Sequence, residues 1–263
     1  EDGNVSRTGE WLFVPGAWVD PSADPASLPP SARTIRVPGG WDRSLKEGRS
    51  TPFGYGTYLL KVLLPPDGED AQYGLRIANV RSAHVLYVNG KRIGGAGEPG
   101  ESRETTKPAN MPYVAAVGDA GFELTIVLHA ANFHYAWQGG LFDTVTFGQL
   151  ADLYREHESR GASDAVIGYG FAAAGGILLL LFVVRLRRPD AGWFAALLLT
   201  FALYWLTHGN KLLFAALPGI GYTGQTLLQQ LCPVGAVATF VQFVRALYPA
   251  VMHRIIFRVV MAV

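Results

Sequence analysis

One short stretch of the chain concentrates side chains that could recognise a ligand. Residues 132–140 read Asn-Phe-His-Tyr-Ala-Trp-Gln-Gly-Gly, so rings, amides and an imidazole follow one another closely. Aromatic faces stack on sugars and other small polar molecules, and amide groups orient them through hydrogen bonds. With aromatic residues from other predicted loops, this stretch forms a candidate ligand-binding set: Trp41, Phe53, Tyr55, Asn132, His134, Tyr135, Trp137 and Gln138. The alternative is that these rings only fill the ends of a β-sandwich.

Residues for catalysis or metal binding do not form a comparable set. His129 and His134 have no further His or Cys at ligand spacing, so we expect structural roles for both. Residues 94–100 are rich in glycine but lack the Gly-Lys-Ser/Thr of a phosphate-binding loop. No two carboxylates can be assigned to one cleft, so a hydrolase site is not supported. We therefore expect neither a catalytic residue nor a cofactor here.

The cysteine content bears on both compartment and metal binding. Cys232 is the only cysteine of the chain and lies in an apolar run. No disulfide framework within one chain and no cysteine-based zinc cluster can form, which is typical of bacterial export more than of eukaryotic secretion. Aspartates and backbone carbonyls of the loops would permit a structural calcium, although no spaced set of ligands requires one.

The N-terminal half shows the pattern of an antiparallel β-fold. About eight short apolar or alternating segments are separated by turn residues, and no strong helical pattern interrupts them. The predicted strands are residues 9–14, 34–37, 57–64, 73–77, 82–88, 91–95, 122–130 and 145–148. Asn89-Gly90 supplies the two positive φ angles of a type I′ hairpin turn. This pattern favours a jelly roll or β-sandwich.

The C-terminal half has the pattern of membrane-spanning helices. Residues 165–184 carry no charge and are long enough to cross a hydrocarbon core of about 30 Å. Two further runs, residues 191–207 and 224–244, predict a second and a third span. A fourth apolar run begins at residue 255, and the sequence ends within it, so we expect a truncated helix bundle.

Charge divides the chain at the same place. Residues 1–164 contain 15 Lys and Arg against 20 Asp and Glu, whereas residues 165–263 contain 7 against 1. The basic residues lie in short segments beside apolar runs, with Arg185, Arg187 and Arg188 directly after the first run. By the positive-inside rule this segment is cytoplasmic and the N-terminal half is outside, so we expect a signal peptide before Glu1. The pattern gives no support for nucleic-acid binding.

These observations predict three parts. Residues 1–149 form an extracytoplasmic sensor domain, residues 150–164 a juxtamembrane helix or plain linker, and residues 165–263 the membrane helices. Ser163-Asp164 is expected to cap the first membrane helix.

Several short motifs occur in an order that resembles a known family. They are Gly9-Glu10-Trp11, Val37-Pro38-Gly39-Gly40-Trp41, Gly54-Tyr55-Gly56-Thr57-Tyr58, Tyr87-Val88-Asn89-Gly90, Asn132-Phe133-His134 and Gly139-Gly140-Leu141, followed further on by Tyr248-Pro249. The pattern is similar to that of bacterial seven-transmembrane receptors with diverse intracellular signalling modules. Their outer domain in turn resembles the galactose-binding-like jelly roll of family 2 glycoside hydrolases.

The resemblance implies a receptor in the bacterial inner membrane. Its periplasmic jelly roll would bind a small, carbohydrate-like ligand and, as a homodimer in the lipid bilayer, regulate a cytoplasmic output domain outside this chain. That output domain would hold any enzymatic activity. Two alternatives remain open: a receptor for a periplasmic protein, and a membrane-tethered carbohydrate-binding module of an enzyme.

Overall fold

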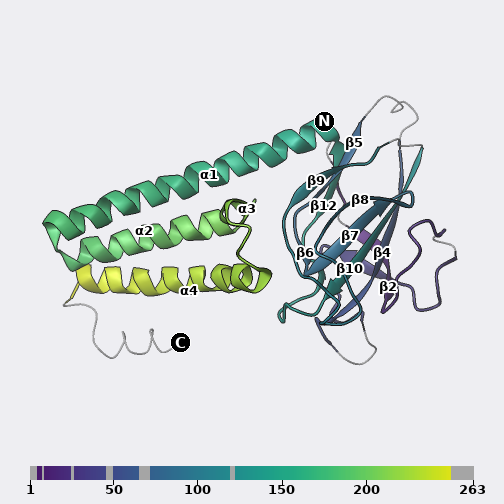
Figure 1. Cartoon of the computed structure of the whole chain (residues 1–263), viewed down its shortest axis with the longest axis horizontal. Helices are drawn as coiled ribbons and strands as arrows, with labels where there is room; N and C mark the ends of the chain where they lie inside the picture. The colour runs from purple at the N-terminus through teal and green to yellow at the C-terminus, as the bar shows by residue number, and fades with distance from the viewer. Residues whose placement is uncertain are drawn as a thin grey trace. The chain divides into compact units, whose positions relative to one another are not determined.

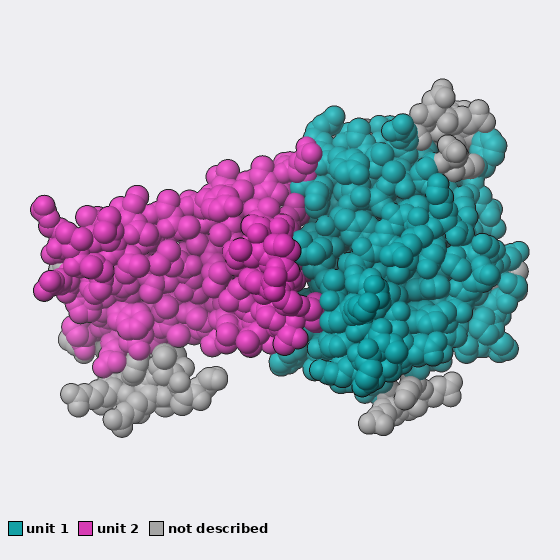
Figure 2. Space-filling view, in the orientation of Figure 1, with its two compact units in different colours: residues 1–157 teal, residues 158–263 magenta. Residues whose placement is uncertain are grey.

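The computed structural model describes residues 5–7, 9–24, 27–45, 50–64, 72–118 and 122–249. The chain divides into two compact units, residues 1–157 and residues 158–263 (Figure 2). The fourth apolar run predicted from residue 255 lies outside the described residues.

The first unit is a β-sandwich in which every strand pair is antiparallel (Figure 1). Its larger sheet has the order β3-β2-β4-β10-β7-β8, its smaller sheet β1-β12-β5-β9, and β11 pairs with β6. The strands are β1 (Val5–Arg7), β2 (Gly9–Pro15), β3 (Arg33–Val37), β4 (Gly54–Leu63), β5 (Tyr73–Ile77), β6 (Val80–Arg81), β7 (Ala83–Val88), β8 (Lys91–Ala96), β9 (Tyr113–Ala116), β10 (Glu123–Asn132), β11 (Gly140–Leu141) and β12 (Val145–Gln149).

The core lies between the two sheets. Along β10, Leu124, Ile126 and Leu128 are completely buried and face it, as their alternation predicts. From the smaller sheet, Leu75 and Phe147 join the same cluster. Burying each such side chain stabilises the fold by about 1.5–3 kcal/mol. The predicted β-sandwich is therefore confirmed.

The turn between β7 and β8 also agrees with the sequence. Asn89 has a φ of 48° and Gly90 a φ of 79°, the two positive values expected for the Asn-Gly hairpin. The Asn89 side chain adds a bond, since its Oδ1 accepts from the Thr125 N–H at 2.8 Å.

A loop crosses the outer face of the larger sheet. We call residues 16–24 the strap. Its backbone is attached to β4, where the Thr57 hydroxyl donates to the Ala17 carbonyl at 2.9 Å and accepts from the Val19 N–H at 3.1 Å. His129 Nε2 of β10 lies 2.8 Å from the Val19 carbonyl oxygen. Thr57 is fully buried as a result.

Helices follow the sandwich. They are α1 (Leu150–Leu181), α2 (Pro189–Thr207), α3 (Leu212–Ala216) and α4 (Tyr222–Leu247), and a π-helical segment, η2 (Phe182–Leu186), extends α1. Among the described residues, three helices are long and apolar enough to cross a membrane: Leu150–Arg185, Pro189–Thr207 and Tyr222–Leu247.

The predicted helix cap at Ser163-Asp164 is wrong. Helix α1 runs without a break from Leu150, so both residues lie in its interior. The Ser163 hydroxyl donates to the Ser159 carbonyl at 2.9 Å, a bond within the helix. The Asp164 carboxylate instead accepts from the Asn210 N–H at 2.9 Å, which joins α1 to the segment after α2.

The second unit is held by contacts between its helices. Helices α2 and α4 run side by side (Figure 1), with Phe194 and Phe243 stacked at 5.0 Å between ring centroids. Gln229 Nε2 of α4 donates to the Thr207 carbonyl of α2 at 2.6 Å. In an apolar surrounding, such polar side chains join neighbouring helices.

Candidate functional site

A hollow of about 430 Å³ opens on the outer face of the larger sheet. Its lining residues are Trp18, Val85, Tyr87, Arg92, Glu98, Pro99 and His129. The volume lies within the range of sites for small molecules, which combine aromatic walls with a few polar groups.

The strand register explains why the floor residues meet. His129 of β10 pairs with Val85 of β7, and Tyr87 of β7 pairs with Arg92 of β8. Residues opposite each other in antiparallel strands project to the same face, with Cβ atoms about 5 Å apart. Because their neighbours Leu128 and Leu86 face the core, these four side chains face outward.

Trp18 comes to the same place from the strap. Its ring centroid lies 5.1 Å from that of His129 and 4.8 Å from that of Tyr55. On the other side, the rings of His129 and Tyr87 are 5.1 Å apart. We call these four residues, Tyr55, Trp18, His129 and Tyr87, the aromatic row.

The chemistry of His129 is determined by its hydrogen bond. A carbonyl oxygen only accepts, so the Nε2 facing the Val19 carbonyl carries the hydrogen. Burial lowers the pKa of His129, with the Val19 bond acting in the opposite direction. The ring is therefore neutral at pH 7, and its Nδ1 is an acceptor.

The charged lining residues differ in their pairing. Glu98 forms an ion pair with Lys107, with Oε2 and Nζ 2.7 Å apart, and the two backbones form a β-bridge. Arg92 is exposed and has no hydrogen bond or ion pair within the described part of the chain. At the end of the aromatic row, Glu101 accepts a hydrogen bond from the Tyr55 phenol; burial, with the Glu101 charge and this bond, raises the pKa of Tyr55.

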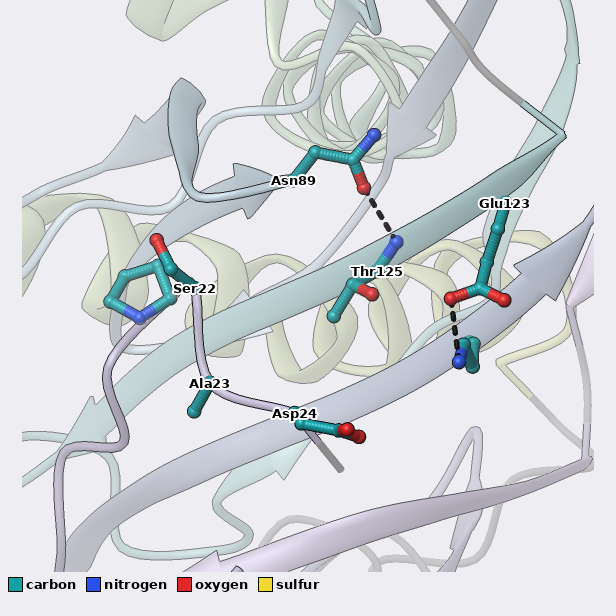
Figure 3. A pocket seen from close by; sticks show the side chains of 8 residues that line it. Ser22, Ala23, Asp24, Asn89, Glu123 and Thr125 are labelled. Atoms are coloured by element: carbon teal, nitrogen blue, oxygen red, sulfur yellow. Dashed lines mark hydrogen bonds and ion pairs between the residues drawn. The ribbon is translucent and has the colours of Figure 1, made fainter. Parts of the chain in front are cut away.

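A second hollow of about 350 Å³ is more polar (Figure 3). Its lining includes Asp24, Asn89, Glu123 and Thr125. Figure 3 shows Asn89 bonded to the Thr125 N–H and the Glu123 carboxylate bonded to an ammonium group, that of Lys61. Because these groups bind one another and no aromatic residue is present, this hollow fits an organic ligand less well.

Two members of the predicted ligand-binding set are fully buried. The Trp41 indole N–H donates to the Pro52 carbonyl at 3.1 Å, and its ring lies 6.1 Å from that of Tyr58. Asn132 Nδ2 donates to the carbonyls of Pro52 and Tyr135 at 2.9 and 2.8 Å, and its Oδ1 accepts from the Tyr135 N–H at 3.0 Å. The Asn132 side chain thus holds the 132–140 loop in place, whereas the Trp41 side chain holds the segment at Pro52.

Other members lie around the same loop. Tyr135 is half-buried, with the Arg81 guanidinium 4.2 Å above its ring. His134 and Gln138 are also half-buried, and burial with the Arg103 charge lowers the pKa of His134. Phe53 and Trp137 have exposed fractions of 40% and 78%.

The structure thus separates the predicted set into two places. Tyr55 belongs to the aromatic row beside the hollow, whereas the other seven residues surround the loop after β10. Sequence reasoning missed Trp18, Tyr87, Arg92 and Glu98. The alternation along β7 indicates that Val85 and Tyr87 face outward, and so could have located part of the floor. No sequence pattern indicates that the strap crosses this face of the sheet.

Within the described residues, no group of three or more His, Cys, Asp and Glu side chains is arranged to hold a metal ion.

No family model and no curated protein matches the chain. Solved structures to which the chain is similar include a β-glucuronidase from Faecalibacterium prausnitzii, with a TM-score of 0.43 and 15% identity over 56% of this chain and 31% of that chain. A β-glucuronidase from Ruminococcus gnavus in complex with uronic deoxynojirimycin has a TM-score of 0.42 and 17% identity over 56% of this chain and 29% of that chain. A β-glucuronidase from an uncultured Clostridium sp. has a TM-score of 0.41 and 14% identity over 57% of this chain and 30% of that chain. The chain spans less than a third of the length of these enzymes, and their activity is not carried over to it.

Proposed function

We propose that this chain is the sensory part of a bacterial membrane receptor that binds a small saccharide in the hollow beside the aromatic row. The observation that carries the proposal is the combination of Trp18, Tyr87 and His129 with charged side chains in a hollow of about 430 Å³. The domain that bears it precedes three helices able to cross a membrane.

The lining supplies the contacts that a sugar ring requires. The C–H face of a pyranose packs against indole and phenol rings, which Trp18 and Tyr87 provide. Hydroxyl groups need both donors and acceptors: the Arg92 guanidinium only donates, and the Glu98 carboxylate only accepts. His129 adds a neutral imidazole between the two rings.

Helix α1 is the element through which we propose that binding is transmitted. Its first N–H, at Leu150, donates to the Gln72 carbonyl at 2.8 Å, and Leu153 is fully buried. A Cβ on Gly74 of β5 would lie 2.7 Å from Leu150 Cδ1, so helix and strand are in close contact there. Since α1 continues into an apolar span, a shift of the smaller sheet would reach the membrane without an intervening flexible linker. The output would be a cytoplasmic domain, in a homodimer.

A protein partner is the second candidate function. Trp137 has 78% of its side chain exposed, on a loop held by buried bonds, and exposed tryptophans are frequent anchors of protein interfaces. In this alternative the 132–140 loop would contact a periplasmic protein.

Calorimetric titration of the chain in lipid nanodiscs, with a panel of mono- and disaccharides, separates these functions. We expect at least one sugar to bind, Trp18→Ala to weaken it about tenfold or more, and Trp137→Ala to leave it unchanged. Retained tryptophan fluorescence and circular dichroism would show that both variants fold. The absence of binding by every sugar would contradict the proposal, and loss only in Trp137→Ala would move the site to the loop.

A further inference from the structure

We propose that the hollow selects an acidic saccharide, whose carboxylate pairs with Arg92. This inference rests on the proposed function and names the class of sugar that the same site takes.

The first observation is the state of Arg92. Its side chain lines the hollow, is exposed, and has neither an ion-pair nor a hydrogen-bond partner among the residues that the structure describes. By contrast, Lys61, Arg155 and Arg188 each pair with a carboxylate.

The second observation is the charge balance of the lining. Glu98 is the one carboxylate that lines the hollow, and Lys107 neutralises it across 2.7 Å. The ring of His129 is neutral, because burial lowers its pKa. The lining of the hollow therefore carries one uncompensated positive charge, which favours an anionic ligand over a neutral one.

The third observation is the position of the guanidinium beside an aromatic ring. Arg92 and Tyr87 are paired residues of adjacent strands and project to the same face. A pyranose lying on Tyr87 would thus direct a substituent at its rim toward Arg92. In a hexuronic acid this substituent is a carboxylate, which matches the planar fork of a guanidinium and forms two parallel hydrogen bonds with it.

The test is a calorimetric titration of the chain in nanodiscs with D-glucuronate and D-galacturonate against D-glucose and D-galactose. We expect at least one uronate to bind about tenfold or more tightly than its neutral counterpart. Arg92→Gln should remove this preference by lowering the affinity for the uronate to about that for its neutral counterpart. Lys91→Gln, which removes the neighbouring exposed cation of β8 that does not line the hollow, should keep the preference.

The outcomes separate the two proposals. Equal affinity for uronate and neutral sugar, or a preference that persists in Arg92→Gln, would overturn this inference and leave the proposed function intact. No binding by any of the four sugars or by the wider saccharide panel would overturn both. Binding of acetate as tight as that of a uronate would assign the site to simple anions and also overturn the inference.

Discussion

His84 illustrates how burial fixes the protonation of a side chain in the sandwich. It lies in β7 with 1% of its surface exposed, and its Nε2 is 2.9 Å from the Tyr113 hydroxyl. Burial lowers the pKa of His84 to about 3. The imidazole of the unfolded chain has an ordinary pKa of about 6.5. Between about pH 6.5 and 3 the ring is therefore protonated in the unfolded chain and neutral in the folded protein.

This difference predicts a loss of stability in mild acid. Above about pH 6.5 both states bind no proton at His84, and between about pH 6.5 and 3 only the unfolded state binds one, so stability falls as pH falls. From pH 7.5 to 5 the contribution of His84 amounts to about 2 kcal/mol. His84→Gln, whose amide can replace Nε2, should flatten the pH dependence of urea unfolding in this window. An unchanged slope would show that His84 is not buried as described.

Residue types alone did not locate the hollow. The 132–140 loop has the composition of a binding loop, yet Asn132 uses its amide on the backbone and Trp41 fills the core. Composition does not distinguish an amide that binds a ligand from one that closes a loop, because both require the same donors and acceptors. The pair of Tyr87 and Arg92 follows from the two-residue Asn89-Gly90 turn, which sets the register of β7 and β8. The pair of His129 and Val85 joins strands that are far apart in the sequence and has no such local signal.

At the scale of elements, the strap determines whether the hollow exists. Trp18 has no strand of its own and reaches the aromatic row only because Thr57 and His129 hold the backbone of Ala17 and Val19. The Thr57 hydroxyl serves both as donor and as acceptor in this arrangement, although its side chain is buried.

Thr57→Val should release the strap at constant side-chain shape. It leaves the buried Val19 N–H and the Ala17 carbonyl without this partner, at a cost of about 1–3 kcal/mol in unfolding free energy. Saccharide binding should weaken as well, because Trp18 loses its fixed position. Thr125→Val, on the same face of the sheet, is the matched control. It should cost little, because the Thr125 N–H that donates to Asn89 Oδ1 belongs to the backbone and is kept. Equal effects of the two substitutions would contradict the role given to the strap.

The elements themselves were largely predictable. Alternation located the eight main strands within a few residues, and the apolar runs located the three long helices. The short strands β1, β6, β9 and β11 were missed, since two to four residues carry no usable period. The continuity of α1 was also missed, because a polar helical segment before an apolar one resembles a separate linker in sequence.

At the scale of the whole molecule, the distribution of charge predicts the orientation in the membrane. Arg185, Arg187 and Arg188 follow the first span, whereas Lys211 is the lone basic residue between the second and third spans. The positive-inside rule then assigns the sandwich to the outer side.

Cysteine labelling of cells with a permeabilised outer membrane tests this orientation. In a Cys232→Ser background, Ala136→Cys on the exposed loop should react with a membrane-impermeant maleimide, and Arg187→Cys should react only after the inner membrane is lysed. The opposite pattern would place the sandwich in the cytoplasm and exclude a periplasmic sensor.

The central claim, that a saccharide occupies the hollow beside Trp18, is tested most directly by fluorine NMR. The chain has six tryptophans, so 5-fluorotryptophan labelling of the protein in nanodiscs gives six resonances that Trp→Phe variants can assign. Titration with the tightest-binding sugar should move the Trp18 resonance along a saturable curve and leave that of Trp137 in place. A saturable shift of Trp137 with an unmoved Trp18 would contradict the account and place the ligand on the loop after β10.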